Sequence, residues 1–204
     1  MRSKFLLGCI ADDFTGATDL ANTLVRGGMR TVQMMGLPNA ALDVSAEAVV
    51  IALKSRTAPR EAAVAESLAA LEWLKSTGCR QFYFKYCSTF DSTMNGNIGP
   101  VADALMRALG TRFAIACPGF PENGRTVYRG HLFVADALLN ESGMQNHPLT
   151  PMTDPNLVRV LQQQTRTKVS LLRYDAIQQG PAAIAAARKA LLEEGVGPAM
   201  VLSQ

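Results

Sequence analysis

The sequence predicts an α/β fold, a three-layer arrangement of a mostly parallel open sheet with helices on both faces and a small inserted β-hairpin. Short apolar runs alternate with segments whose apolar residues recur at helical spacing, which is the pattern of parallel β-α-β units. Three of these helical segments end in a glycine that is followed two residues later by arginine, at 28–30, 78–80 and 110–112. Glycine at this place typically supplies the left-handed residue that ends a helix.

The first half of the chain contains three such units. The first apolar run stops abruptly at Asp12-Asp13, and Leu20, Leu24 and Val25 then recur at helical spacing. The predicted elements are, in order, a strand at 5–11, a helix ending at 27–28, a strand after Arg30, a strand at 48–52, a helix at 59–77, a strand at 81–86, a helix through 101–109 and a strand at 113–117.

After Pro118 the alternation changes. Two short runs, 125–128 and 131–134, flank Arg129-Gly130 and indicate a β-hairpin. A loop rich in proline follows at 146–155. The remaining elements are a helix at 156–163, a strand at 168–172, a helix at 181–194 that begins with proline and ends at Gly195, and a strand at 199–202.

The composition excludes several classes of protein. Lys and Arg number 20 against 17 Asp and Glu, which gives a net charge of +3. This excess of positive charge is too small to form the clustered basic surface that is typical of nucleic-acid binders. The sequence has no apolar run long enough to cross a bilayer, and its N-terminus lacks the features of a signal peptide. We therefore expect a cytoplasmic protein with no nucleic-acid or membrane partner, and assembly into a homo-oligomer is compatible with the sequence.

The metal-binding residue types are sparse and scattered. The four cysteines include no C-x-x-C pair, and the two histidines, His131 and His147, lie apart in the sequence. The sequence therefore predicts no metal site and no disulfide framework. It also contains no G-x-x-x-x-G-K-[ST], G-x-G-x-x-G or G-x-S-x-G motif, so we expect neither a standard nucleotide-binding loop nor a serine nucleophile elbow in this chain.

Charged and hydroxyl side chains follow four of the predicted strands. In an open parallel sheet, ligands bind at the carboxyl ends of the strands because the β-α loops gather there. Cations at this edge would hold an anionic substrate, and carboxylates beside them would accept hydroxyl protons, which suits a small hydroxy acid. The residues expected in this site are Asp12, Asp13, Lys54, Arg56, Lys85, Asp91, Asn123 and Arg125.

Each of these signals has a structural alternative. One carboxylate of Asp12-Asp13 can face a ligand while the other caps the helix that starts near Thr15, or both can be caps. Lys85 either emerges from the sheet into solvent or fixes an anion. The hydroxyl-rich run 88–93 can cradle a carboxylate or phosphate together with the amides of the following helix, or it can be ordinary turn and cap chemistry.

Several motifs together resemble the N-terminal half of the four-carbon acid sugar kinase family. They occur in order from about residue 5 to residue 200, and they are 11–19 (Ala-Asp-Asp-Phe-Thr-Gly-Ala-Thr-Asp), 54–56 (Lys-Ser-Arg), 82–93, 96–100, 123–126 (Asn-Gly-Arg-Thr) and 146–152. The resemblance implies an ATP-dependent kinase that phosphorylates the terminal hydroxyl of a four-carbon acid sugar, 3-oxo-tetronate, to give the 4-phosphate. It also implies that 1–204 is the acid-sugar-binding domain. ATP and Mg²⁺ would be bound mainly by a C-terminal domain absent from this chain, so the chain alone would be inactive.

The resemblance also implies roles for individual residues. Asp12 or Asp13 would orient or deprotonate the attacking hydroxyl. The residues expected to contact the acid are Lys54, Arg56, Lys85 and Arg125 at its carboxylate, Ser88, Thr89 and Asn123 at its hydroxyls or ketone, and Thr15 and Asp91 nearby. Two other functions stay open: a non-catalytic binding module that kept the fold, and a lyase or isomerase that forms a Schiff base at Lys85.

Overall fold

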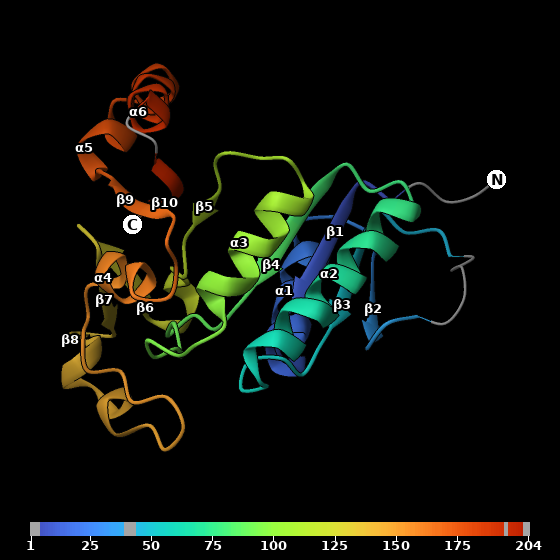
Figure 1. Ribbon diagram of the computed structural model, residues 1–204, viewed down its shortest axis with the longest axis horizontal. Coiled ribbons are helices and arrows are strands. Elements are labelled where there is room, and N and C mark those ends of the chain that lie inside the picture. Colours follow the sequence, from blue (N-terminus) through green and yellow to red (C-terminus); the bar gives the residue numbers. More distant parts are fainter. Residues whose placement is uncertain (1–4, 39–43, 194–195, 202–204) are drawn as a thin grey trace. The chain divides into compact units, whose positions relative to one another are not determined.

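The computed structural model describes residues 5–38, 44–193 and 196–201 and separates the chain into two units, Met1–Cys87 and Ser88–Gln204. The first unit contains a parallel sheet of strand order β2-β3-β1-β4 (Figure 1). The strands are β1 (Leu7–Ala11), β2 (Thr31–Met35), β3 (Ala48–Ala52) and β4 (Gln81–Lys85). All five residues of β3 are buried, as expected of a strand in a parallel sheet with both faces covered.

Helices α1 (Phe14–Arg26) and α2 (Arg60–Ser76) cover opposite faces of this sheet. Cys9 and Ala11 of β1 form a core cluster with α1, which contributes Ala17. Gly8 points to the other face, where an added Cβ would lie only 3.0 Å from Leu74 of α2. Because neighbouring residues of a strand point to opposite faces, these contacts confirm the predicted layers of helix, sheet and helix.

The second unit contains two further sheets. The parallel sheet has the order β5-β10-β9, and the antiparallel sheet has the order β6-β7-β8. The strands are β5 (Ile115–Ala116), β6 (Arg125–Tyr128), β7 (His131–Val134), β8 (Ala137–Leu138), β9 (Lys168–Leu172) and β10 (Val196–Val201). The helices are α3 (Ile98–Ala108), η1 (Pro121–Asn123), η2 (Leu139–Glu141), η3 (Gly143–Asn146), α4 (Leu157–Gln162), α5 (Tyr174–Gln178) and α6 (Pro181–Glu193).

The α/β class and the inserted hairpin are confirmed. The hairpin turn has a positive φ at both Arg129 (46°) and Gly130 (89°), which is the geometry of a two-residue type I′ turn. The structure adds a third strand, β8, to this hairpin and a short helix, α5, that the sequence analysis did not predict. The predicted helix end at 194–195 and the last residue of the predicted strand 199–202 lie outside the described residues.

The strand predicted at 113–117 differs from the expectation in length and in sheet membership. Only Ile115 and Ala116 are in β5, and they pair with β10 in the second unit rather than with the sheet around β1. The Thr111 hydroxyl donates to the carbonyl of Phe113 and accepts from its N–H. This local turn delays the start of the strand, and the alternation of strands and helices carries no information on which sheet a strand joins.

Candidate functional site

The adjacent strands β1 and β3 of the first unit form a topological switch point. The chain leaves β1 through α1 to reach β2 beyond β3, and it leaves β3 through α2 to reach β4 beyond β1. The connections of two adjacent strands therefore depart in opposite directions and on opposite faces. Ligands of open α/β sheets bind at the carboxyl ends of the strands at such a switch point. The loops that begin there carry Asp12 and Asp13 after β1 and Arg56 after β3.

The main chain of Asp12 connects the ends of three strands. Its N–H donates to the carbonyl of Lys85 at 3.0 Å, and its carbonyl accepts from the N–H groups of Ser55 and Arg56 at 3.0 and 3.1 Å. These bonds extend the ladders of the sheet by one residue on each side of β1. The predicted residues Asp12, Arg56 and Lys85 are therefore brought together by backbone pairing.

A guanidinium lies between the two adjacent carboxylates. Arg56 contacts Asp12 in a bidentate manner, with Nη2 donating to Oδ1 at 2.7 Å and Nε to Oδ2 at 3.1 Å. Its Nη2 also lies 2.9 Å from Oδ1 of Asp13. The side chain of Asp12 is only 6% exposed, against 20% for Arg56 and 27% for Asp13. Asp12 and Arg56 thus form a partly buried ion pair, and Asp13 is the more accessible carboxylate.

Burial and pairing act against each other in this cluster. Burial raises the pKa of Asp12, although the hydrogen bonds and charge of Arg56 and the charge of Lys85 act to lower it. For Arg56, burial disfavours the charged form, but the hydrogen bond and charge of Asp12 raise the pKa of the guanidinium above its usual range. Arg56 therefore stays charged and holds the two carboxylates in place.

Asp13 is the N-cap of α1, and Lys85 lies over the first turn of the same helix. The Oδ1 of Asp13 accepts from the N–H of Gly16 at 2.8 Å, so one carboxylate of the pair is a cap, as one alternative predicted. The Nζ of Lys85 donates to the carbonyl of Tyr86 at 2.8 Å and lies 3.4 Å from the position of a Cβ on Gly16. Glycine at this position leaves room for the ammonium close to the helix N-terminus.

Lys54 and Thr15 are exposed at the same edge of the sheet. Lys54 lines a pocket of about 440 Å³ whose walls include Phe14, Met35 and Leu37. These three apolar side chains are all exposed, and sequence reasoning missed them because single exposed apolar residues are common in proteins. Phe14, which lines this pocket, directly follows Asp13 in the sequence.

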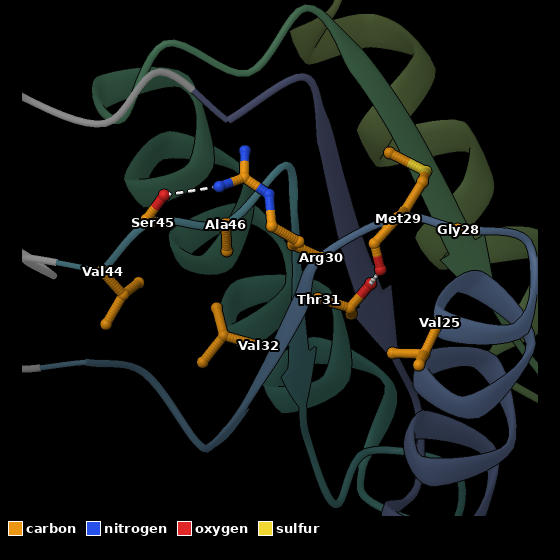
Figure 2. A pocket seen from close by; sticks show the side chains of 9 residues that line it. All are labelled: Val25, Gly28, Met29, Arg30, Thr31, Val32, Val44, Ser45 and Ala46. Atoms are coloured by element: carbon orange, nitrogen blue, oxygen red, sulfur yellow. Dashed lines mark hydrogen bonds between the residues drawn. The ribbon is translucent and has the colours of Figure 1, made fainter.

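A second pocket, of about 500 Å³, lies at the opposite edge of the sheet (Figure 2). Its lining includes Arg30, whose guanidinium donates to Ser45 at 2.6 Å and to Glu47 at 3.4 Å. The N–H of Arg30 also donates to Glu47, and this bond, with the guanidinium, lowers the pKa of that carboxyl. The arginine at this edge is thus engaged in structural contacts.

The other five predicted site residues belong to the second unit, and they are Ser88, Thr89, Asp91, Asn123 and Arg125. Thr89 donates to Asp91 with Oγ1 and Oδ1 2.6 Å apart, and the guanidinium of Arg125 donates to the carbonyl of Asn123. Ser88 is half-buried. The placement brings together Thr89 with Asp91 and Asn123 with Arg125.

The hydroxyl-rich run is held by a residue that sequence reasoning missed. Gln164 donates to the Ser92 hydroxyl and the Thr93 carbonyl, and its Oε1 accepts from the N–H of Gly99 in the first turn of α3. One amide of the helix that follows the run, that of Gly99, is therefore bonded within the protein. No local signal points to Gln164, because it lies 72 residues from Ser92.

In the ranges that the structure describes, no group of three or more His, Cys, Asp or Glu side chains could hold a metal ion. The Nδ1 of His131 lies 3.1 Å from the carbonyl of Arg129, and that of His147 lies 2.8 Å from the hydroxyl of Thr150. Both rings are thus engaged locally. Among the described residues, no helix has the length and apolar character needed to cross a membrane.

Comparisons with known proteins agree on one family. Residues 7–202 match the family described as the sugar-binding N-terminal domain. The 3-oxo-tetronate kinase of Burkholderia multivorans is 68% identical over 194 residues, which cover 95% of this chain and 45% of that protein. The protein of the same name from Cupriavidus necator is 70% identical over 194 residues and is covered to the same 45%. The chain spans about half the length of the curated relatives it matches.

Solved structures show the same fold. A crystal structure from Haemophilus influenzae has a TM-score of 0.94 at 50% identity and covers 96% of this chain, which matches 48% of that one. A Bordetella bronchiseptica protein with bound citrate, a domain-swapped dimer, has a TM-score of 0.79 at 28% identity, with 98% of this chain and 49% of that one covered. With a family match over nearly its whole length and these relatives, the chain belongs to the sugar-binding N-terminal domain family.

Proposed function

We propose that this chain is the substrate-binding part of a cytoplasmic ATP-dependent kinase that phosphorylates the terminal hydroxyl of 3-oxo-tetronate to give the 4-phosphate. The relatives named 3-oxo-tetronate kinase support the reaction, and citrate in the Bordetella bronchiseptica structure supports a small hydroxy acid as ligand. The observation that carries the proposal is the cluster of two carboxylates and two cations at the switch point. A homo-oligomer is part of the proposal, because that relative is a domain-swapped dimer.

Lys85 is the proposed anchor for the carboxylate of the acid. Its ammonium lies over the first turn of α1, where the helix dipole also favours an anion. Arg56 is already bonded to Asp12 and Asp13, so its proposed role changes from contact with the acid to positioning of these carboxylates. Lys54, which lines the adjacent pocket, is the second cation available to the acid.

Asp13 is the proposed proton acceptor. It is the more exposed carboxylate of the pair, and Arg56 and the N–H of Gly16 hold its Oδ1 in place. In the transfer, the hydroxyl oxygen of the acid forms a bond to the γ-phosphorus, the bond between that phosphorus and ADP breaks, and the hydroxyl proton moves to the carboxylate. Asp12, buried against Arg56, keeps the guanidinium in position.

ATP and Mg²⁺ are proposed to be bound mainly by a part of the enzyme outside residues 1–204. The sequence has no glycine-rich phosphate-binding motif, and the described residues offer no metal-binding cluster. ATP supplies the phosphoryl group and Mg²⁺ balances its charge when both are bound.

Replacement of Lys85 by methionine should weaken binding of 3-oxo-tetronate by about 1.5–3 kcal/mol, because a charged hydrogen bond to the ligand is lost while most of the side-chain stem remains. Titration calorimetry on the 204-residue chain measures the effect. The matched control is Lys75→Met on α2, which removes an exposed lysine paired with Glu72 and should leave affinity unchanged. Equal affinity of the Lys85 variant and the parent chain would remove Lys85 from the acid site.

The 204-residue chain by itself should bind the acid weakly, with a Kd on the order of millimolar, because the acid stays accessible to water without the rest of the proposed enzyme. It should release no ADP from ATP, because its sequence has no glycine-rich phosphate-binding motif. An assay that couples ADP release to a spectroscopic signal checks this with 3-oxo-tetronate as substrate. Addition of the remaining half of a relative should restore some turnover if the halves dock. Steady ADP release by the chain alone would show that residues 1–204 contain a nucleotide site.

A further inference from the structure

Gln164 follows α4 and lies outside every motif of the sequence, yet its side chain is buried and makes three hydrogen bonds. Its Nε2 donates to the Ser92 hydroxyl at 2.6 Å and to the Thr93 carbonyl at 2.7 Å, and its Oε1 accepts from the N–H of Gly99 at 2.9 Å. Gln164 is only 7% exposed. One amide group therefore connects the end of the predicted acid-binding run 88–93 to the first turn of α3.

The position of Gln164 is fixed from the side of α3. An added Cβ on Gly99 would lie 2.6 Å from the Cβ of Gln164 and 3.1 Å from its carbonyl carbon, so only glycine allows this approach. One turn further along α3, the carboxylate of Asp103 accepts from the hydroxyls of Thr165 and Thr167. The segment that carries Gln164 thus contacts α3 at two places. These contacts fix the backbone of Gln164, and therefore the position from which its side chain reaches the run 88–93.

The run that Gln164 holds is strained. Phe90 has a φ of 55°, in the left-handed region that residues with a side chain rarely adopt, and it is fully buried. Such a conformation persists only when surrounding contacts impose it. The Phe90 ring is buried, and the chain that follows it is bonded at Ser92 and Thr93, where the Ser92 nitrogen also lies 3.5 Å from the sulfur of Met152.

Thr89 and Asp91 flank the strained residue and are joined by a hydrogen bond. Loss of the bonds at Ser92 and Thr93 would let the backbone at Phe90 relax, and both of its neighbours would move with it. Gln164, which lies 72 positions beyond Ser92 in the sequence, is therefore bonded to the segment that directly follows Asp91.

We propose that Gln164 is a positioning residue for acid binding: it holds the run 88–93 in the conformation in which the buried Thr89 orients the Asp91 carboxylate toward a four-carbon hydroxy acid, without contacting the acid itself. The proposal rests on the proposed function and on the sequence-based prediction that Asp91 lies in the acid site. It adds a determinant of affinity that lies outside all the motifs of the sequence.

The test is the affinity of the 204-residue chain for 3-oxo-tetronate, measured by calorimetry below the unfolding transition. Gln164→Glu keeps the size and the acceptor for Gly99 but replaces both amide donors with an oxygen that repels the Thr93 carbonyl, and it should weaken binding at least tenfold. The matched control is Gln178→Glu, because Gln178 is an exposed residue of α5. Its affinity should stay within twofold of the parent chain.

A double-mutant cycle separates positioning from general destabilisation. Ser92→Ala removes one of the same bonds and should weaken acid binding about threefold, and its combination with Gln164→Glu should weaken binding by less than the product of the two single effects. If Gln164→Glu does not fold, Ser92→Ala alone decides, and unchanged affinity overturns the proposal. Acid binding by the parent chain with unchanged affinity of the Gln164 variant would overturn the role of Gln164 alone. A parent chain that binds no acid would overturn the proposed function and this role together.

Discussion

Arg56→Met should lower the free energy of unfolding by about 3–5 kcal/mol at neutral pH, because it leaves the buried carboxylate of Asp12 without its bidentate partner. Methionine retains much of the stem of arginine, so the lost charge and hydrogen bonds dominate the effect. Urea unfolding of the parent chain and the variant measures the difference as a shift of the midpoint at similar slope.

The loss should shrink as the pH falls. Burial already raises the pKa of Asp12 in the parent chain, where Arg56 acts to lower it, so removal of Arg56 raises this pKa further. The folded variant then binds a proton at a higher pH than its unfolded chain does, and its relative stability rises as the pH falls through that interval.

Lys75→Met is the control for this stability measurement. It breaks the ion pair between Lys75 and Glu72, whose side chains are 41% and 63% exposed, and exposed pairs contribute only about 0–1 kcal/mol. A loss of the same small size for Arg56→Met would contradict the view that Asp12 and Arg56 form an energetically important buried pair.

In the proposed full-length kinase, Asp13→Asn should lower the turnover number by about 10²–10⁴-fold while the Michaelis constant for the acid stays within a few fold, because proton removal from the hydroxyl matters mainly in the transition state. The fold should be preserved, since asparagine caps a helix about as well as aspartate. An assay coupled to ADP release gives both constants, and thermal unfolding checks the cap.

The matched control for turnover is Asp175→Asn, which changes a carboxylate of α5 that is 55% exposed. The roles of the pair would be exchanged if Asp13→Asn kept full turnover and a folded Asp12→Asn variant lost it. Full turnover in both variants would mean that neither carboxylate accepts the proton, and that positioning and charge stabilisation account for the catalysis.

The sequence was informative wherever the signal is local. Apolar spacing predicted α1, α2 and the strands around them, and the residues at which helices end were marked by Gly28, Gly78 and Gly110, which all have positive φ. The Arg129-Gly130 pair predicted the hairpin turn. The Asp12-Asp13 pair after a buried strand indicated a helix cap, but it did not tell that Asp13 is the residue that caps α1.

What only the tertiary structure decided are the pairings between residues far apart in the chain. Order in the sheet places β1 between β3 and β4, and only this order brings Arg56 to Asp12, 44 residues away. The same holds for β5, which joins the second sheet, and for Gln164, which reaches Ser92 across 72 residues. Local signals such as helical spacing, caps and turns act over a few residues and can therefore be predicted from a short window of sequence. Strand order and buried polar contacts depend instead on how whole faces pack, and this depends on every element at once.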